Sequence, residues 1–210
     1  MIFTAELNRG GYMKVIGLTG GSGSGKGVAG KLFGSLGCYV IDADALYHKM
    51  ISADSPCSRA LIAHFGLEIS NEYGGIDRSC LRDIVFSDSS ALAALNSIAH
   101  SYVRAECEAI FEEQKKRGTE YVVIDAPQLF EAGMEELCDA VVAVTAKLET
   151  RIERIVFRDK ITREKAEARI ASQHDDAFFE ENCDHVIKND SDAAHLLLAV
   201  KHVFDIIKDM

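Results

Sequence analysis

The chain of 210 residues contains no tryptophan and only 2 prolines. No apolar run approaches the roughly 20 residues of a transmembrane helix, and the first residues lack the apolar core of a signal peptide. Positive charge is scarce, because 23 Lys and Arg residues face 33 Asp and Glu, a formal net charge of -10. Attraction to a nucleic-acid backbone normally needs a basic surface. We therefore expect a soluble cytoplasmic protein with neither a membrane nor a nucleic-acid partner.

Cysteine pairs with metal-ligand spacing are also missing. The 6 cysteines are spread along the chain without a CxxC pair, and most of them sit among apolar residues. This distribution favours buried free thiols over disulfides or a zinc site.

Five short apolar segments alternate with segments of helical periodicity. The predicted strands are residues 15–19, 38–41, 121–124, 140–145 and 185–187. This alternation predicts an α/β fold with a parallel five-stranded sheet covered by helices on both faces. In such folds, ligands bind at the carboxyl ends of the strands.

Two longer segments interrupt the alternation. Residues 45–118 carry several helix patterns and almost no strand signal, which predicts a helical acceptor-binding insertion. Residues 158–183 are rich in charge, as mobile lids of phosphotransferases are. The nucleotide-binding core is then formed by residues 13–44, 119–157 and 184–210. We assign residues 1–12 to a disordered extension or to a segment before an alternative start at Met13.

A glycine-rich turn joins the first predicted strand to the first predicted helix. Gly20 to Gly27 reads GGSGSGKG, which matches the phosphate-binding pattern GxxxxGK[ST] except that Gly27 replaces Ser or Thr. Glycines let backbone N–H groups turn toward phosphate oxygens, and the helix N-terminus adds its positive dipole end. A turn without a ligand is the alternative. We favour a nucleotide, with Lys26 on the β and γ phosphates. The predicted ATP-binding residues of this loop are Gly21, Ser22, Gly23, Ser24, Gly25, Lys26, Gly27 and Val28.

Acidic residues follow the second and third predicted strands. Asp42 and Asp44 come after one strand and Asp125 after the next. A carboxylate at this edge can accept a proton from an attacking hydroxyl, or orient it, and we favour Asp44 for that role. Asp42 is equally well interpreted as the cap of a helix that begins near Ala45. Because Gly27 offers no side-chain oxygen to Mg²⁺, Asp125 becomes the candidate metal residue, binding directly or through water.

These motifs, taken together with several others, resemble the dephospho-coenzyme A kinase family. The loop alone would be unspecific, but the loop, the Asp-Ala-Asp and the Pro-x-Leu-Phe-Glu sequence together are specific. The likeness runs from about Met13 to the C-terminus. It is carried by residues 16–26, 40–44, 99–100, 104–106, 125–133, 149–150, 158–159, 168–171, 173 and 184–189.

The resemblance implies transfer of the ATP γ phosphate to the ribose 3′-hydroxyl of dephospho-coenzyme A, the last step of coenzyme A biosynthesis. It also implies a P-loop kinase fold, with ATP and Mg²⁺ bound, and we expect a monomer. Asp44 would act as base or orienting group, and Arg158 would neutralise charge on the transferring group alongside Lys26. Asn189 would lie at the adenine, and His100 and Arg104 would bind the acceptor.

Several of these residues also have plainer interpretations. Arg154, Arg158 and Arg169 have a helical spacing that is typical of a solvated charged face, and we favour a functional role for Arg158 only. A histidine on a partly apolar helix, such as His100, is more often a packing residue.

The chain departs from the family pattern at a few positions, which concern metal binding and the charge of the lid. Gly27 replaces Ser or Thr, Ser101 replaces Pro, Gln128 replaces an apolar residue, Lys188 replaces Asp, and His174-Asp175-Asp176 stands where a basic residue is common.

Two alternative functions stay open. Another P-loop kinase for a nucleoside or nucleotide is disfavoured by the Asp-Ala-Asp and the long insertion. A catalytically weakened ATP-binding protein is disfavoured by the presence of Asp44.

Overall fold

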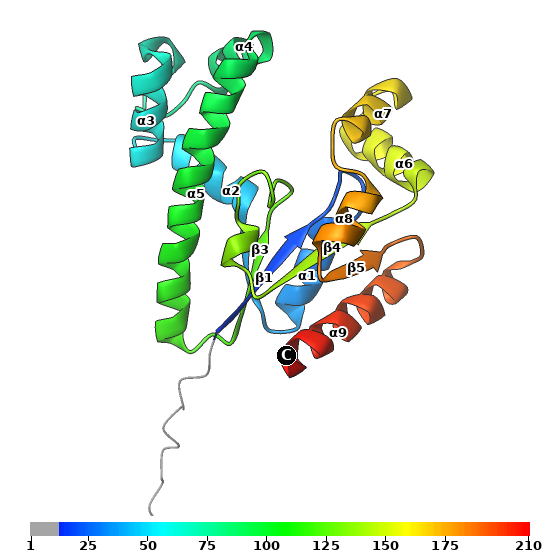
Figure 1. Ribbon diagram of the computed structural model, residues 1–210. Coiled ribbons are helices and arrows are strands. Elements are labelled where there is room, and N and C mark those ends of the chain that lie inside the picture. The colour runs from blue at the N-terminus through cyan, green and yellow to red at the C-terminus, as the bar shows by residue number, and fades with distance from the viewer. Residues whose placement is uncertain (1–12) are drawn as a thin grey trace, which may run out of the picture.

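The computed structural model describes residues 13–210, and a parallel five-stranded sheet lies at the centre of this part of the chain (Figure 1). The predicted extension, residues 1–12, lies outside the described residues. The strand order is β2-β3-β1-β4-β5. The strands are β1 (Lys14–Thr19), β2 (Tyr39–Asp42), β3 (Tyr121–Asp125), β4 (Ala140–Thr145) and β5 (His185–Lys188). All five strand predictions are confirmed to within one residue at each end.

The sheet is covered on both faces, as predicted. Helices α1 (Lys26–Ser35) and α9 (Ala193–Asp209) pack on one face, where Phe204 contacts the rings of Phe33 and Tyr121 edge-on. The central part of α5 (Ser89–Arg117) and the chain that follows β3 pack on the other face. Every residue of β4 is buried, which explains its nearly unbroken apolar sequence.

The strand order creates a crevice at the carboxyl ends of β1 and β3. From β1 the chain runs toward β2, whereas from β3 it crosses β1 to reach β4. Connections that leave two neighbouring strands in opposite directions leave room for a ligand between them. The glycine-rich loop follows β1 and Asp125 ends β3, so both border this crevice.

The predicted insertion forms a helical lobe with a small core of its own. It comprises α2 (Ala43–Ile51), α3 (Pro56–Phe65), the short 3-10 helix η1 (Leu67–Ile69), α4 (Arg78–Ser87) and the first half of α5. Its core contains Ile51, Cys57, Leu61, Ile69, Ile76 and Leu81. Helix α5 belongs to both parts, because Leu95 and Tyr102 contact this core whereas Val103 and Phe111 contact the sheet.

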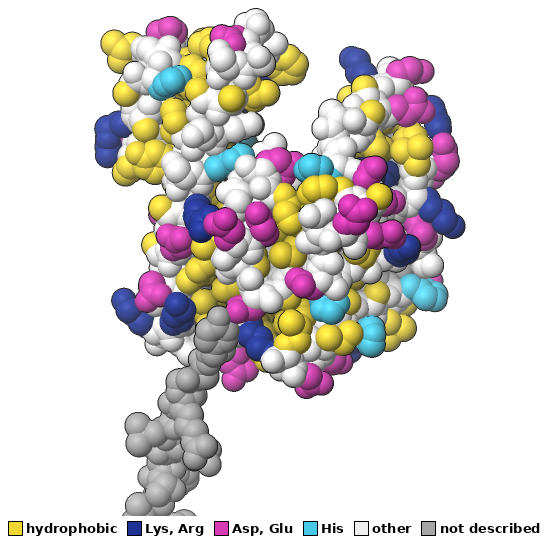
Figure 2. Space-filling view, viewed as in Figure 1, with side chains coloured by type: hydrophobic (Ala, Val, Ile, Leu, Met, Phe, Trp, Pro, Cys, Tyr) yellow, Lys and Arg dark blue, Asp and Glu magenta, His cyan; other side chains and the backbone are white. Residues whose placement is uncertain are grey.

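The predicted lid region is helical as well. It contains the end of α6 (Leu148–Asp159), then α7 (Arg163–Ala171) and α8 (Asp176–Asn182). Ile152, Ile155 and Ala166 form a small apolar contact between α6 and α7. The remaining short element is the 3-10 helix η2 (Glu135–Leu137). Figure 2 shows the surface hollowed between the insertion and these lid helices, above the carboxyl edge of the sheet.

All six cysteines lie within residues 13–210 and are free thiols. Cys38, Cys57 and Cys107 are buried as predicted, whereas Cys80 is exposed. Burial raises the pKa of Cys38 and of Cys107 to about 12, so both stay protonated and act as packing groups. None of the helices in residues 13–210 is long and apolar enough to cross a membrane.

Candidate active site

The phosphate-binding loop depends on glycine at positions with a left-handed backbone. Gly20, Gly23 and Gly25 have φ angles of 141°, 79° and 100°. At Gly23 a Cβ atom would lie 2.6 Å from the carbonyl oxygen of Arg151, so the neighbouring chain excludes a side chain there as well. The loop is thus built for close backbone approach, the geometry that phosphate recognition by N–H groups requires.

Side chains from α6 and from the end of β5 hold the loop from outside. Asn189 is buried, and its Nδ2 atom donates to the carbonyl oxygen of Ser24 at 2.7 Å. The guanidinium of Arg154 donates to the carbonyl oxygens of Gly23 and Ser24, each at 3.2 Å, and to that of Asn189 at 3.2 Å. The interpretation of Arg154 as part of a solvated face is therefore wrong, because its side chain turns inward to bind loop carbonyls.

Ser22 is fixed by two further side chains that the sequence did not single out for a role. Its N–H donates to Oε1 of Gln173 at 2.8 Å, and its carbonyl oxygen accepts from Nε of Arg151 at 2.9 Å. Arg151 is buried and also lies 3.7 Å from the carboxylate of Asp176 on α8. The spacing of Arg151, Arg154 and Arg158 places them near one face of α6. This shared face was the signal in the sequence that could have assigned Arg151 to the site.

Replacing Arg154 with glutamine is expected to raise the KM for ATP about tenfold. The change removes charged donors from loop carbonyls, and one hydrogen bond to a charged group contributes about 1.5–3 kcal/mol, where 1.4 kcal/mol is a factor of ten. Steady-state kinetics measures this effect. Arg163→Gln is the matched control, since Arg163 is an exposed arginine of α7 that pairs only with Glu149 and Glu167 among residues 13–210. Equal KM values for ATP in the two variants would contradict this role of Arg154.

Lys26 and Asp125 face each other across the crevice between β1 and β3. They form an ion pair, and Asp125 is only 8% exposed. Burial raises the pKa of Asp125, the Lys26 ammonium opposes that rise, and the carboxylates of Asp42 and Asp44 add to it. The lysine that we expect on the nucleotide phosphates thus neutralises a carboxylate in this structure.

Most of the predicted phosphate residues border one cavity together with the predicted metal and base residues, whereas Ser24, Gly25 and Val28 do not line it. It has a volume of about 500 Å³ and lies at the carboxyl edge of the sheet. Its lining includes Gly20, Gly21, Ser22, Gly23, Lys26, Gly27, Asp42, Asp44, His48, Asp125 and Arg158. Segments far apart in the sequence therefore bring a cation, three carboxylates and a glycine-rich loop to one place.

The two aspartates after β2 have different environments. Asp42 is the N-cap of α2 and accepts a hydrogen bond from the N–H of Ala45 at 2.8 Å, so its interpretation as a cap is confirmed. The helix begins two residues earlier than predicted, at Ala43. Asp44 lies in its first turn, and its carboxylate is exposed without a hydrogen bond or ion pair to any residue of 13–210. Asp44 is therefore free to receive a proton.

Gly27 opens onto the same cavity. A Cβ atom at this position would have no heavy atom within 4 Å. The missing Ser or Thr is therefore not excluded by crowding, and the space beside Lys26 could hold a hydroxyl.

Arg158 stands at the end of α6 and reaches the cavity from the lid side. Its guanidinium is paired with Asp159, with contacts of 2.7 and 3.0 Å. Arg169 from α7 binds the same carboxylate. The side chain of Arg158 is largely exposed, so exchanging Asp159 for a phosphate needs no core rearrangement.

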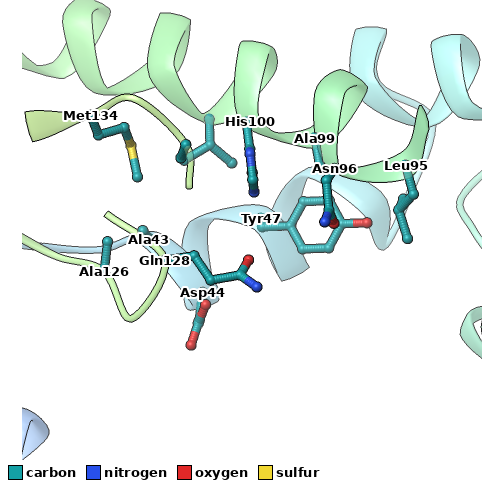
Figure 3. A pocket seen from close by; sticks show the side chains of 12 residues that line it. Ala43, Asp44, Tyr47, Leu95, Asn96, Ala99, His100, Ala126, Gln128 and Met134 are labelled. Carbon is teal, nitrogen blue, oxygen red and sulfur yellow. The ribbon is translucent and has the colours of Figure 1, made fainter. Parts of the chain in front are cut away.

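A second, smaller pocket adjoins Asp44 on the insertion side. Figure 3 shows Asp44 and Tyr47 from α2, Gln128 from the chain after β3, and His100 from α5 around it. Its volume is about 110 Å³ and its lining is mostly apolar. The predicted acceptor residue His100 thus shares a pocket with the predicted base.

Arg104 lies one helical turn beyond His100 and lines a neighbouring groove with it. Its Nη1 atom donates to the carbonyl oxygen of Gly133 at 2.8 Å and pairs with Glu136 at 3.0 Å. Arg104 is not among the residues around the pocket that contains Asp44. The structure therefore places His100 in the same pocket as Asp44, and Arg104 only in the adjacent groove.

Comparisons with known proteins agree with this geometry. The sequence model of the dephospho-CoA kinase family matches residues 14–195. The chain is 39% identical to the dephospho-CoA kinase of Moorella thermoacetica over 162 residues, 77% of this chain and 76% of that protein. It is 37% identical to that of Fusobacterium nucleatum over 194 residues, 92% of this chain and 98% of that protein.

Solved structures give the same result at the level of the fold. Dephospho-CoA kinase from Campylobacter jejuni matches with a TM-score of 0.70 and 27% identity, over 95% of this chain and 100% of that one. A shikimate kinase from Acinetobacter baumannii matches with a TM-score of 0.53 and 15% identity over 94% of both chains, which shows the shared P-loop kinase fold alone. With a family match across most of its length and this arrangement of loop, lysine and carboxylates, the chain belongs to the dephospho-CoA kinase family.

Proposed function

We propose that the protein transfers the γ phosphate of ATP to the ribose 3′-hydroxyl of dephospho-coenzyme A, giving coenzyme A and ADP. The observation that carries this proposal is the shared cavity of Asp44, Lys26 and the glycine-rich loop in a member of this family. The cavity brings an unpaired carboxylate next to the place where a nucleotide phosphate would lie. A nucleoside kinase and a weakened ATP-binding protein are not favoured by the family match.

Each residue then has a distinct task in the reaction. The carboxylate of Asp44 accepts the proton of the 3′-hydroxyl as its oxygen bonds to the γ phosphorus and the bond to the ADP oxygen breaks. Lys26 and the loop N–H groups stabilise charge on the phosphates, and Arg158 adds a planar cation from the lid. His100 contacts the acceptor from α5, with Arg104 beside it. Asn189 fixes the loop next to the adenine.

Mg²⁺ fits this cavity by the chemistry of its donors. Carboxylate oxygens are ligands that Mg²⁺ prefers, and Asp125 lines this space. Residues 13–210 contain no group of three or more such side chains placed to hold an ion by themselves, so phosphate oxygens and water would complete the coordination. Asp125 would hold the ion, directly or through water, and the ion would neutralise phosphate charge. Since Gly27 has no hydroxyl, we expect weak apparent affinity for the metal.

Replacing Gly27 with serine is expected to lower the Mg²⁺ concentration at half-maximal activity several-fold. The new hydroxyl adds an oxygen ligand, and the open space at Gly27 accepts it without a clash. Gly34→Ser on the same helix is the control, because a Cβ there makes only an ordinary contact, 3.5 Å from Val40. Calorimetric titration of ADP at several Mg²⁺ concentrations gives a readout independent of turnover. An unchanged Mg²⁺ midpoint in both measurements would contradict the proposal.

A coupled assay of ADP release tests the function directly. We expect dephospho-coenzyme A to stimulate ADP formation strongly over the rate with ATP alone. Stimulation by a nucleoside or nucleotide instead would point to another P-loop kinase, and no stimulation by any acceptor would point to a nucleotide-binding protein.

We further propose that the protein works as a cytoplasmic monomer, in which residues 45–118 bind the acceptor and residues 158–183 close over ATP. The apolar cluster within the insertion supports treating it as a separate unit, whereas Ile152 and Ile155 of α6 anchor the lid to the core through Ala166. Light scattering coupled to size-exclusion chromatography measures the mass, and a value near twice 23.0 kDa would overturn the monomer.

A further inference from the structure

A groove between α2 and α4 has no role in the site described above. It has a volume of about 420 Å³ and combines cationic side chains with an apolar floor. Its lining consists of Tyr47, His48, Ile51, Arg78, Ser79, Leu81, Arg82, Val85 and Leu95.

The groove adjoins the cavity that contains Asp44. His48 lines both of them, and Tyr47 lines both the groove and the small pocket next to Asp44. Asp44 and His48 are four residues apart on α2, so their side chains lie on the same face, about 6 Å apart along the axis. A molecule with a hydroxyl at Asp44 therefore extends naturally past His48 into this groove.

Arg78 is the most available cation in the groove. Its guanidinium forms neither a hydrogen bond nor an ion pair with any residue of 13–210, and it lies close enough to Tyr47 to oppose the rise that burial causes in the pKa of that phenol. Arg82 contacts only Ser79 at 3.2 Å and Asp83 at 3.5 Å within the same range.

The other arginines around the acceptor side are engaged. Arg104 binds Gly133 and Glu136, and Arg158 binds Asp159. In a protein of net charge -10, an arginine without a partner beside a groove is well placed for an anionic ligand.

We propose that this groove binds the 5′-diphosphate of the acceptor, with Arg78 as its main contact and with Arg82 and His48 beside it. The inference rests on the proposed function and adds a subsite to it. The diphosphate is attached to the same ribose that presents its 3′-hydroxyl to Asp44, so the two groups must bind at neighbouring places. The planar fork of Arg78 can donate two parallel hydrogen bonds to phosphate oxygens. Ile51, Leu81 and Val85 supply apolar surface for the aliphatic arm beyond the diphosphate.

Kinetics of the Arg78→Ala variant test this subsite. We expect the KM for dephospho-coenzyme A to rise about 10- to 100-fold, as for the loss of charged hydrogen bonds. The KM for ATP and kcat are expected to stay within about twofold. Arg78→Lys should show an intermediate effect, because an ammonium keeps the charge but not the bidentate geometry. Arg59→Ala is the control, since Arg59 is an exposed arginine of the same insertion, paired with Asp54 outside the groove.

Two further measurements separate the possible causes of a defect. Thermal unfolding of Arg78→Ala should stay close to the wild type, because the Arg78 guanidinium forms no hydrogen bond or ion pair within residues 13–210. Calorimetric binding of dephospho-coenzyme A without ATP should weaken by the same factor as the KM. An unchanged KM for dephospho-coenzyme A, or an equal rise in both KM values, would overturn the subsite. Wild-type protein that fails to use dephospho-coenzyme A at all would instead overturn the proposed function.

Discussion

Replacing Asp44 with asparagine is expected to lower kcat by about 10²- to 10⁴-fold, the range that a positioned general base contributes. Asparagine has nearly the same shape but cannot accept the proton of the 3′-hydroxyl. Because the Asp44 carboxylate forms no hydrogen bond or ion pair with any residue of 13–210, the change should leave the fold and the phosphate loop intact. The affinity for ATP, measured by calorimetry, should therefore remain close to that of the wild type.

Asp42→Asn is the matched comparison for this experiment. Asp42 lies two residues earlier and lines the same cavity, but its carboxylate caps α2. Asparagine caps a helix about as well as aspartate does, so we expect a far smaller loss of kcat. If Asp44→Asn lost ATP binding in proportion to its rate, Asp44 would have a structural role and not the role of a base.

Replacing Lys26 with methionine is expected to lower kcat/KM by about 10²- to 10³-fold, comparable to the loss of one preorganised donor to the transition state. Lys26 lines the cavity directly after the glycine-rich loop, and methionine keeps its apolar stem while removing the charge. The variant should also weaken nucleotide binding. Kinetics with both substrates and titration with ADP measure the two effects.

The same variant removes the partner of Asp125, and this has a consequence for stability. Burial already raises the pKa of Asp125, and loss of the opposing ammonium raises it further. When the pKa of a carboxyl is higher in the folded than in the unfolded state, the free energy of unfolding of the protein falls as the pH increases toward that raised pKa. The destabilisation of Lys26→Met relative to the wild type should therefore be larger at pH 8 than at pH 5 in thermal unfolding.

The double variant Lys26→Met with Asp125→Asn separates the two roles of Lys26. The neutral amide removes the unpaired buried charge, so unfolding should lose the added pH dependence while activity stays low. Recovery of activity in the double variant would show that Lys26 acts by pairing with Asp125 and not on the phosphates.

The fold was largely predictable because its signals are local. Each strand is a short apolar segment bounded by polar residues or glycine, and the glycines of the phosphate loop mark the first turn. Residue type made a cap at Asp42 one of two equally supported interpretations, and the hydrogen bond from Ala45 shows the cap. The sequence did not predict that α5 contacts both the core of the insertion and the sheet. The apolar residues that make these two sets of contacts follow one helical periodicity and therefore indicate a single amphipathic helix.

The candidate site was predictable where the residue types themselves carry the chemistry. Asp44, Asp125 and Lys26 stand at strand ends or in the loop, and the topology brings them together. The sequence interpretation of Arg154 is wrong because helical spacing is the same for arginines that face solvent and for arginines that face the loop. Whether such a guanidinium meets water or loop carbonyls depends on tertiary contacts more than 100 residues apart in sequence.

In the proposed reaction, Asp44 and the glycine-rich loop direct the phosphate of ATP to the ribose 3′-oxygen of dephospho-coenzyme A. The most direct test incubates wild-type protein with ATP, Mg²⁺ and dephospho-coenzyme A, and then follows ADP while phosphorus NMR locates the new phosphate. We expect equal amounts of ADP and of a 3′-phosphomonoester on coenzyme A, both nearly absent with Asp44→Asn. ADP formation without that phosphomonoester, or a product unaffected by Asp44→Asn, would contradict it.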